Sequence, residues 1–384
     1  MKLYLLVAAI SALVTFAAVP LIRVFARKIG AMTPVRERDV HTRPTPRLGG
    51  VAMLLGVAVA MAVASRIPFF QGAIFDQGAR EPWAVLGAAG LVCLLGAADD
   101  LWDLDWLTKL SGQVLAAGLL AWQGVQLVTF PIAGLTITSS RFSLMMTVLV
   151  IVVAINAVNF IDGLDGLAAG LVCIGAGAFF VYTYLLSVQS NARTYASLAA
   201  LILAALVGVC VGFLPYNFHP ASIFMGDSGA YLLGLLFAAA TIAVTGQIDP
   251  WANPRQALPA FLPILLPVLT LALPLLDVTW SALRRLSKGL SPFHPDRMHL
   301  HHRLLSLGHT HRRAVLILYL WTALISFSGA ALVQFSLNSV MVGMGAGAVI
   351  AAVLTVMPIG KRRRHPPQPA DDDGTTEKEV SHHG

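Results

Sequence analysis

Residues 143–167 decide the fold, and they read SLMMTVLVIVVAINAVNFIDGLDGL. The stretch begins as a nearly unbroken apolar run and ends in a series of polar side chains. Apolar blocks of similar length recur along the chain, and about 20 such residues cross about 30 Å of hydrocarbon at 1.5 Å per residue. We therefore expect residues 143–158 to form one transmembrane helix among many.

The composition agrees with this interpretation. The 384 residues are 57% hydrophobic and only 12% charged, and the mean hydropathy is +0.75. Ordinary soluble domains carry about 25% charged residues. The composition excludes a soluble enzyme, a disordered regulator and a repeat solenoid.

We predict an all-α polytopic integral membrane protein with about eleven transmembrane helices. The expected spans are 3–22, 48–66, 82–98, 110–128, 143–158, 167–188, 195–213, 229–248, 257–279, 314–334 and 340–358. Residues 1–358 are predicted to form a single membrane domain, and 359–384, which are rich in basic residues, proline and acids, a disordered cytoplasmic tail.

The distribution of lysine and arginine predicts the orientation. Twenty of the 26 lie in the set of loops that includes 23–47, 99–109 and 280–313. Basic residues are retained on the cytoplasmic side, so the N-terminus is expected outside and the C-terminus in the cytoplasm. The net charge of +7 then reports orientation, not binding to nucleic acid. Sixteen of the 19 acids also lie at or near this face, which orientation rules do not explain and which indicates chemistry there.

A first acidic cluster lies where the third span leaves the membrane. It contains Asp99, Asp100, Asp103 and Asp105. Four carboxylates so close repel one another and are costly near hydrocarbon, and a divalent metal would offset them. If the helix continued, Asp99 and Asp103 would share one face. The alternative is a solvated helix end, although carboxylates are unfavourable at a helix C-terminus.

A second cluster follows the fifth span, where polar residues recur at every third position: Asn156, Asn159, Asp162 and Asp165. Residues three apart are neighbours on a helix. An isolated asparagine can join helices in a membrane, but four polar residues in register favour a functional site.

A third cluster runs from Asn217 through Phe224 to Asp227, just before the eighth span. Asp227 lies at the expected start of a helix, where backbone amides attract anions. It could hold a metal or phosphate, or it could be an ordinary N-cap.

The loop at 280–313 contains a histidine-rich run with His299, His301, His302 and Arg303. Zinc is one alternative and a solvated basic face is another. The flanking arginines favour contacts with phosphate oxygens. Arg47, before the paired glycines of the second span, and Lys109 are further candidates for phosphate contacts, with Lys109 alternatively an interfacial side chain that reaches toward water.

These motifs together resemble one family. DDxxD at 99–103, NxxNxxDGxDGL at 156–167, the stretch from Asn217 to Gly229, and HLHHRLLSLG at 299–308 resemble those of the polyprenyl-phosphate N-acetylhexosamine-1-phosphate transferases, glycosyltransferase family 4. Two details resemble the UDP-GlcNAc branch of the family, which uses undecaprenyl or decaprenyl phosphate. Leu300 interrupts the run of histidines, and an aspartate, Asp103, is the last residue of DDxxD. The phospho-N-acetylmuramoyl-pentapeptide transferase of peptidoglycan synthesis is the alternative within the family.

The resemblance implies an enzyme that transfers GlcNAc-1-phosphate from UDP-GlcNAc to a membrane polyprenyl phosphate and releases UMP. The step would begin a cell-envelope glycan such as lipopolysaccharide, teichoic acid or arabinogalactan. The implied cofactor is Mg²⁺, with Mn²⁺ as an alternative, and the implied location is the plasma membrane with the active site on the cytoplasmic face. A homodimer is one assembly that the resemblance allows. An ion-coupled transporter and a non-catalytic scaffold are the rival classes.

The resemblance also implies roles for individual residues. The residues with implied catalytic roles are Asp99, Asp100, Asp162, Asp165, His301 and His302. Those implied to bind substrate are Arg47, Lys109, Asn156, Asn159, Asn217, Phe224, His299 and Arg303. Those implied to bind the metal are Asp100 and Asp227.

Overall fold

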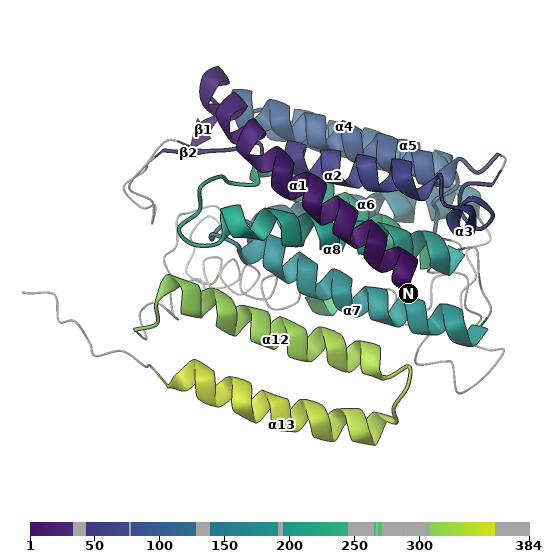
Figure 1. Ribbon diagram of the computed structural model, residues 1–384, viewed down its shortest axis with the longest axis vertical. Helices are drawn as coiled ribbons and strands as arrows, with labels where there is room; N and C mark the ends of the chain where they lie inside the picture. Colours follow the sequence, from purple (N-terminus) through teal and green to yellow (C-terminus); the bar gives the residue numbers. More distant parts are fainter. Residues whose placement is uncertain are drawn as a thin grey trace, which may run out of the picture.

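The computed structural model describes residues 1–33, 44–76, 78–127, 139–190, 195–244 and 308–357, together with 265, 268–270, 287 and 304. Its helices are α1 (Lys2–Ile29), α2 (Gly49–Ala64), α3 (Pro68–Gln71), α4 (Glu81–Trp102), α5 (Trp106–Trp122), α6 (Ser140–Ile161), α7 (Leu167–Ser190), α8 (Tyr195–Asn217), α9 (Gly226–Val244), α12 (His311–Ala331) and α13 (Leu337–Val356). The long helices lie alongside one another with their axes roughly aligned (Figure 1).

The predicted all-α membrane fold is confirmed. Within the described ranges, eight helices are long and apolar enough to cross a membrane, and Gly49–Ala64 is a shorter apolar helix. The predicted span at 257–279 lies almost entirely outside the described residues, as does the predicted tail at 359–384. The side of the membrane on which each terminus lies stays a prediction.

From α1 to α9, consecutive long helices alternate in direction, so that the C-terminal ends of α4, α6 and α8 lie beside the N-terminal ends of α5, α7 and α9. Helix α12 also begins at this end. Hydrogen bonds join these ends: Asn159 to Asp227, Gly166 to Asn217, and Arg312 to His219. We call this the polar end of the bundle. In Figure 1 it is on the left, and the N-terminus is at the opposite end.

Helix α9 occupies the centre of the bundle. Every residue from Ser228 to Val244 is buried, and the helix packs against α2, α4, α6 and α8. A helix that is apolar on all sides is a core helix. By contrast, α13 buries only Ala351 and packs on α12 at the lower edge of Figure 1.

A short β-ladder, which the sequence did not predict, lies at the polar end. Strand β1 (Met32–Thr33) pairs antiparallel with β2 (Thr45–Pro46). Helix α1 continues past its apolar block to Ile29 and ends at Gly30, whose φ is 78°, a conformation that glycine adopts at low cost. The ladder then leads the chain directly into α2.

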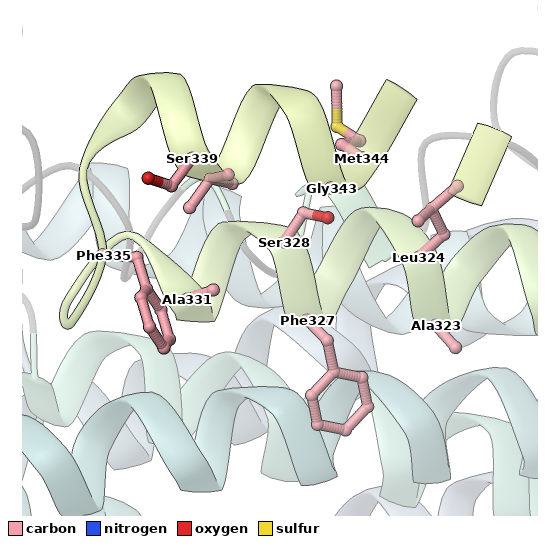
Figure 2. Close-up of a pocket in the computed structure, with 10 residues that line it drawn as sticks. Ala323, Leu324, Phe327, Ser328, Ala331, Phe335, Ser339, Gly343 and Met344 are labelled. Carbon is pink, nitrogen blue, oxygen red and sulfur yellow. The ribbon is translucent and has the colours of Figure 1, made fainter. Parts of the chain in front are cut away.

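A cavity of about 420 Å³ lies between α12 and α13. Figure 2 shows its lining, which includes Phe327, Phe335 and Met344. The lining comes from the C-terminal half of α12 and the N-terminal half of α13, so the cavity lies away from the polar end. None of the described residues that line it is charged, so these residues offer no phosphate site.

The close contact between α4 and α9 predicts different effects for two glycines of α4. A Cβ on Gly96 would lie 2.4 Å from the backbone of Asp227 and Ser228, whereas a Cβ on Gly90 would meet no atom within 4 Å. We expect Gly96→Ala to lower the unfolding temperature in detergent, since overpacking costs about 1–3 kcal/mol. Gly90→Ala should be neutral or slightly stabilising. Equal unfolding temperatures for the two variants would contradict this packing.

Candidate active site

The carboxylate of Asp100 caps the N-terminus of α9. Its Oδ1 accepts a hydrogen bond from the backbone N–H of Asp227 at 3.0 Å, and its Oδ2 accepts one from Ser228 at 3.3 Å. The side chain of Asp100 is 1% exposed. The first amides of a helix have no partner within the helix, so this carboxylate satisfies donors that would otherwise be buried without one.

This contact requires a glycine before Asp227. Gly226 has a φ of 68°, and a Cβ there would lie 2.2 Å from Asp100 Oδ2. The anion site that we expected at the start of this helix is thus filled by a carboxylate of the chain itself. Asp100 consequently sets the position of Asp227.

Asp99 lies on the same turn of α4 and is also buried. Its Oδ2 is 2.8 Å from Lys109 Nζ, and it accepts a hydrogen bond from the hydroxyl of Tyr231 at 3.2 Å. Its Oδ1 accepts from the backbone N–H of Leu104 at 2.9 Å. Lys109 is about a quarter exposed, so its ammonium group remains accessible from solvent.

Asp227 joins the carboxylates of α4 to the polar series of α6. Its Oδ1 accepts a hydrogen bond from Asn159 Nδ2 at 2.7 Å, and its carboxyl group interacts with that of Asp99. Two ionised carboxylates in such proximity repel one another, and a proton or a cation between them relieves the repulsion.

Asp162 lies just beyond α6 and interacts electrostatically with the carboxylates of Asp227 and Asp100. Burial, followed by the carboxylates of Asp227 and Asp100, raises the pKa of Asp162 to about 8. These surroundings favour the protonated carboxyl, and a cation at this point would favour its ionised form.

Arg47 supplies a second positive charge. Its Nη1 is 3.8 Å from Asp100 Oδ1, and its Nε donates to Thr33 Oγ1 at 2.7 Å. The β-ladder fixes its backbone, whose N–H donates to Ala31 O. Among the described residues, this cluster therefore gathers four carboxylates and two cations: Asp99, Asp100, Asp162 and Asp227 with Arg47 and Lys109.

The other two acids of the first cluster have local roles. Helix α4 ends at Trp102, and Asp103 is exposed with a φ of 50°, so it does not share a helical face with Asp99. Asp105 is the N-cap of α5 and accepts hydrogen bonds from the backbone N–H of Leu107 and Thr108. Of the four acids in the first cluster, Asp99 and Asp100 therefore belong to the site, whereas Asp103 and Asp105 lie at helix ends.

The remaining described candidates lie around this cluster. Asn156, one turn deeper in α6, donates to Gln113 Oε1 at 2.7 Å and thereby joins α6 to α5. Asn217 accepts from Gly166 N and donates to Ile223 O, which holds two connections together. The backbone N–H of Phe224 donates to Pro46 O, beside Arg47.

Asp165 has different neighbours from Asp162. It is buried, and its Oδ2 lies 2.8 Å from Nδ1 of His219 and accepts from the backbone N–H of Ala221 at 3.0 Å. The candidates His299, His301, His302 and Arg303 lie outside the described residues.

Sequence reasoning missed two residues that contact this cluster. Tyr231 follows Asp227 by four positions, a spacing that places both on one helical face, and this signal could have identified it. Gln113 contacts Asn156 from a helix whose other buried residues are apolar, and a single polar residue at membrane depth was the available signal.

Known proteins resemble this chain. A family model described as glycosyl transferase family 4 matches residues 82–245. The decaprenyl-phosphate N-acetylglucosaminephosphotransferase of Mycolicibacterium smegmatis is 43% identical over 93% of this chain and 89% of the relative. The enzyme of that name from Mycobacterium tuberculosis is 40% identical over the same shares. A probable undecaprenyl-phosphate N-acetylglucosaminyl 1-phosphate transferase of Bacillus subtilis is 34% identical over 84% of this chain and 83% of its own.

The cap on α9 predicts a graded effect at Asp100. Asp100→Ala removes both acceptors and leaves buried amides unsatisfied, at about 1–3 kcal/mol each, so we expect a clearly lower unfolding temperature in detergent. Asp100→Asn keeps one acceptor oxygen and should lose less.

Asp103→Asn is the matched control, because this exposed position tolerates asparagine with a positive φ. An unfolding temperature for Asp100→Ala equal to that of Asp103→Asn would show that the carboxylate does not hold the helix.

Proposed function

The chain belongs to glycosyl transferase family 4, and we propose that it transfers N-acetylglucosamine 1-phosphate from UDP-GlcNAc to a polyprenyl phosphate in the membrane, releasing UMP. The observation that carries the proposal is the pair of neighbouring carboxyl groups of Asp99, which is buried, and Asp227, which is half-buried, with Lys109 beside them, at the end of a bundle of membrane helices.

The names of the relatives support this substrate pair. The relatives described above are named as transferases that act with decaprenyl or undecaprenyl phosphate and N-acetylglucosamine phosphate. They favour this reaction over the peptidoglycan alternative. An ion-coupled carrier would be expected to hold its acids near the middle of the membrane, whereas these acids gather at the helix ends.

A divalent cation fits the donor set. Mg²⁺ prefers carboxylate oxygens and usually keeps several waters and substrate phosphates as ligands. Asp227 and Asp100, the ligands that the family resemblance implies, would hold it, with Asp99 beside them, and Asp100 also positions Asp227 through the cap on α9. When bound, the ion would neutralise the diphosphate and the charge that develops on transfer.

The cations of the chain receive the phosphates. Lys109 has three donors, of which Asp99 takes one, so the others can contact a phosphate. Arg47, a third exposed, can bind a second phosphate through the remaining donors of its guanidinium group. Together they reduce the repulsion between two anionic substrates.

The chemical step exchanges one phosphoanhydride for another. An oxygen of the lipid phosphate attacks the β-phosphorus of UDP-GlcNAc, and the bond to the α-phosphate breaks to release UMP. A phosphate monoester has its second pKa near 6, so the attacking oxygen is mostly ionised at neutral pH. Asp99 therefore orients the lipid phosphate through Lys109 more than it deprotonates it, and positioning supplies most of the rate.

The polar residues at the end of α6 are proposed to bind the nucleotide sugar. Asn159, which already contacts Asp227, and Asp162 line the space next to the acids. Asn217 and Phe224 are proposed near the uracil, and His299, His301, His302 and Arg303 at phosphates, as the family resemblance implies. We place this site on the cytoplasmic face of the plasma membrane, where the basic loops predict it.

Carboxylate substitutions test the assignment. We expect Asp99→Asn and Asp227→Asn each to lower turnover by more than about tenfold, because each removes charge from the site that holds the phosphates. The measurement is UMP release from UDP-GlcNAc by purified protein supplied with a polyprenyl phosphate. Asp76→Asn, at an exposed position of the opposite end, is the control and should be nearly silent. Near-normal turnover in either site variant, with the protein folded, would refute the assignment.

Metal removal tests the cofactor. Treatment with a chelator should abolish UMP release, and Mg²⁺ or Mn²⁺ should restore it, because the paired carboxylates leave the diphosphate unscreened without a cation. Full activity after removal of divalent ions would eliminate the metal from the mechanism while leaving the substrates unaffected.

A further inference from the structure

A second group of metal-ligating side chains lies beside the carboxylate cluster. Asp165, His219 and His311 offer one ligand atom each, and these atoms all lie within 4.8 Å of one another. They come from three separate places: the turn between α6 and α7, the connection after α8, and the first residue of α12. The mechanism proposed above uses none of the three in this grouping.

The spacing within the group suits a metal with roughly right-angled ligands. Asp165 Oδ2 and His219 Nδ1 are 2.8 Å apart. With metal–ligand bonds of about 2.0–2.2 Å, two such atoms subtend about 85° at the ion, which is an edge of an octahedral or five-coordinate site. The ring of His311 is stacked on that of His219, with 4.4 Å between the centroids and 23° between the planes, so one imidazole must turn out of the stack for both to bind the same ion.

Neighbouring hydrogen bonds hold two of the three groups in place. The backbone N–H of Ala221 donates to Asp165 Oδ2 at 3.0 Å, and Arg312 Nε donates to the carbonyl of His219 at 2.7 Å. Such outer contacts orient ligands and are typical of metal centres. Asp165 is buried and His311 is 9% exposed, whereas the side chain of His219 is 29% exposed, so a metal could enter the site from the side of His219.

The ligand chemistry differs from that of the carboxylate cluster. Mg²⁺ takes oxygen ligands, whereas two imidazoles and a carboxylate favour a transition metal such as zinc, iron, nickel or copper. We propose that Asp165, His219 and His311 bind a divalent transition metal, zinc in particular, which joins the α6–α7 turn to the start of α12. Because Asp162 lies on the same turn, the ion would also fix the position of that carboxyl group.

Metal content and thermal unfolding of the purified full chain test this proposal. After chelator treatment, Zn²⁺ is titrated by equilibrium dialysis with elemental analysis. We expect the wild type to bind one more equivalent of zinc than His311→Ala or His219→Ala. Zinc should raise the unfolding temperature of the wild type, and the same concentration of Mg²⁺ should not raise it through this site.

His309→Asn is the matched control, since His309 lies two residues from His311 but contacts Thr355 O. It should keep the full number of zinc equivalents. Asp165→Asn preserves a hydrogen-bond acceptor and should bind zinc at least about tenfold more weakly, which provides a second variant if a histidine substitution does not fold.

Equal zinc content in wild type, His311→Ala and Asp165→Asn would overturn the proposal, because the metal would then be bound by other histidines. So would the absence of saturable zinc binding to the wild type. Neither result depends on UMP release, so the proposal can fail while the transferase assignment stands.

Discussion

The contact on which the polar end depends is the carboxylate of Asp100 against the first amides of α9. A helix in the centre of a bundle cannot expose its N-terminal N–H groups to water, and unsatisfied backbone groups are costly in a membrane protein. Asp100 solves this problem from α4, and Gly96 and Gly226 give the space for it. Because Asp227 is the second residue of α9, the same contact sets the distance between Asp227 and Asp99.

The long apolar blocks could be predicted because a membrane helix is defined by length and composition alone. The meeting of distant polar motifs could also be predicted, since helices that alternate in direction bring every second connection to the same side. The structural role of each individual residue could not be predicted. Asp103 and Asp105 look like Asp99 and Asp100 in the sequence, but a break in the helix after Trp102 turns them into helix ends. That break depends on a backbone conformation that apolar periodicity does not encode.

The asparagines illustrate a second limit. Asn156, Asn159 and Asn217 were all expected to bind substrate, yet in the structure each contacts the protein: Gln113, Asp227 and Gly166 respectively. An amide side chain both donates and accepts, so it suits a site in which a carboxylate must be held and a ligand contacted. Composition identifies such residues as unusual at membrane depth, but only the fold assigns their partners.

Among the described residues, the members of the polar cluster, from Arg47 to Tyr231, all precede the end of α9, whereas His311 belongs to α12. Because a chain is synthesised from its amino end, these acids and cations all leave the ribosome before α12 and α13. The first residue of α12 can therefore reach Asp165 and His219 only after the residues of the polar cluster have been made.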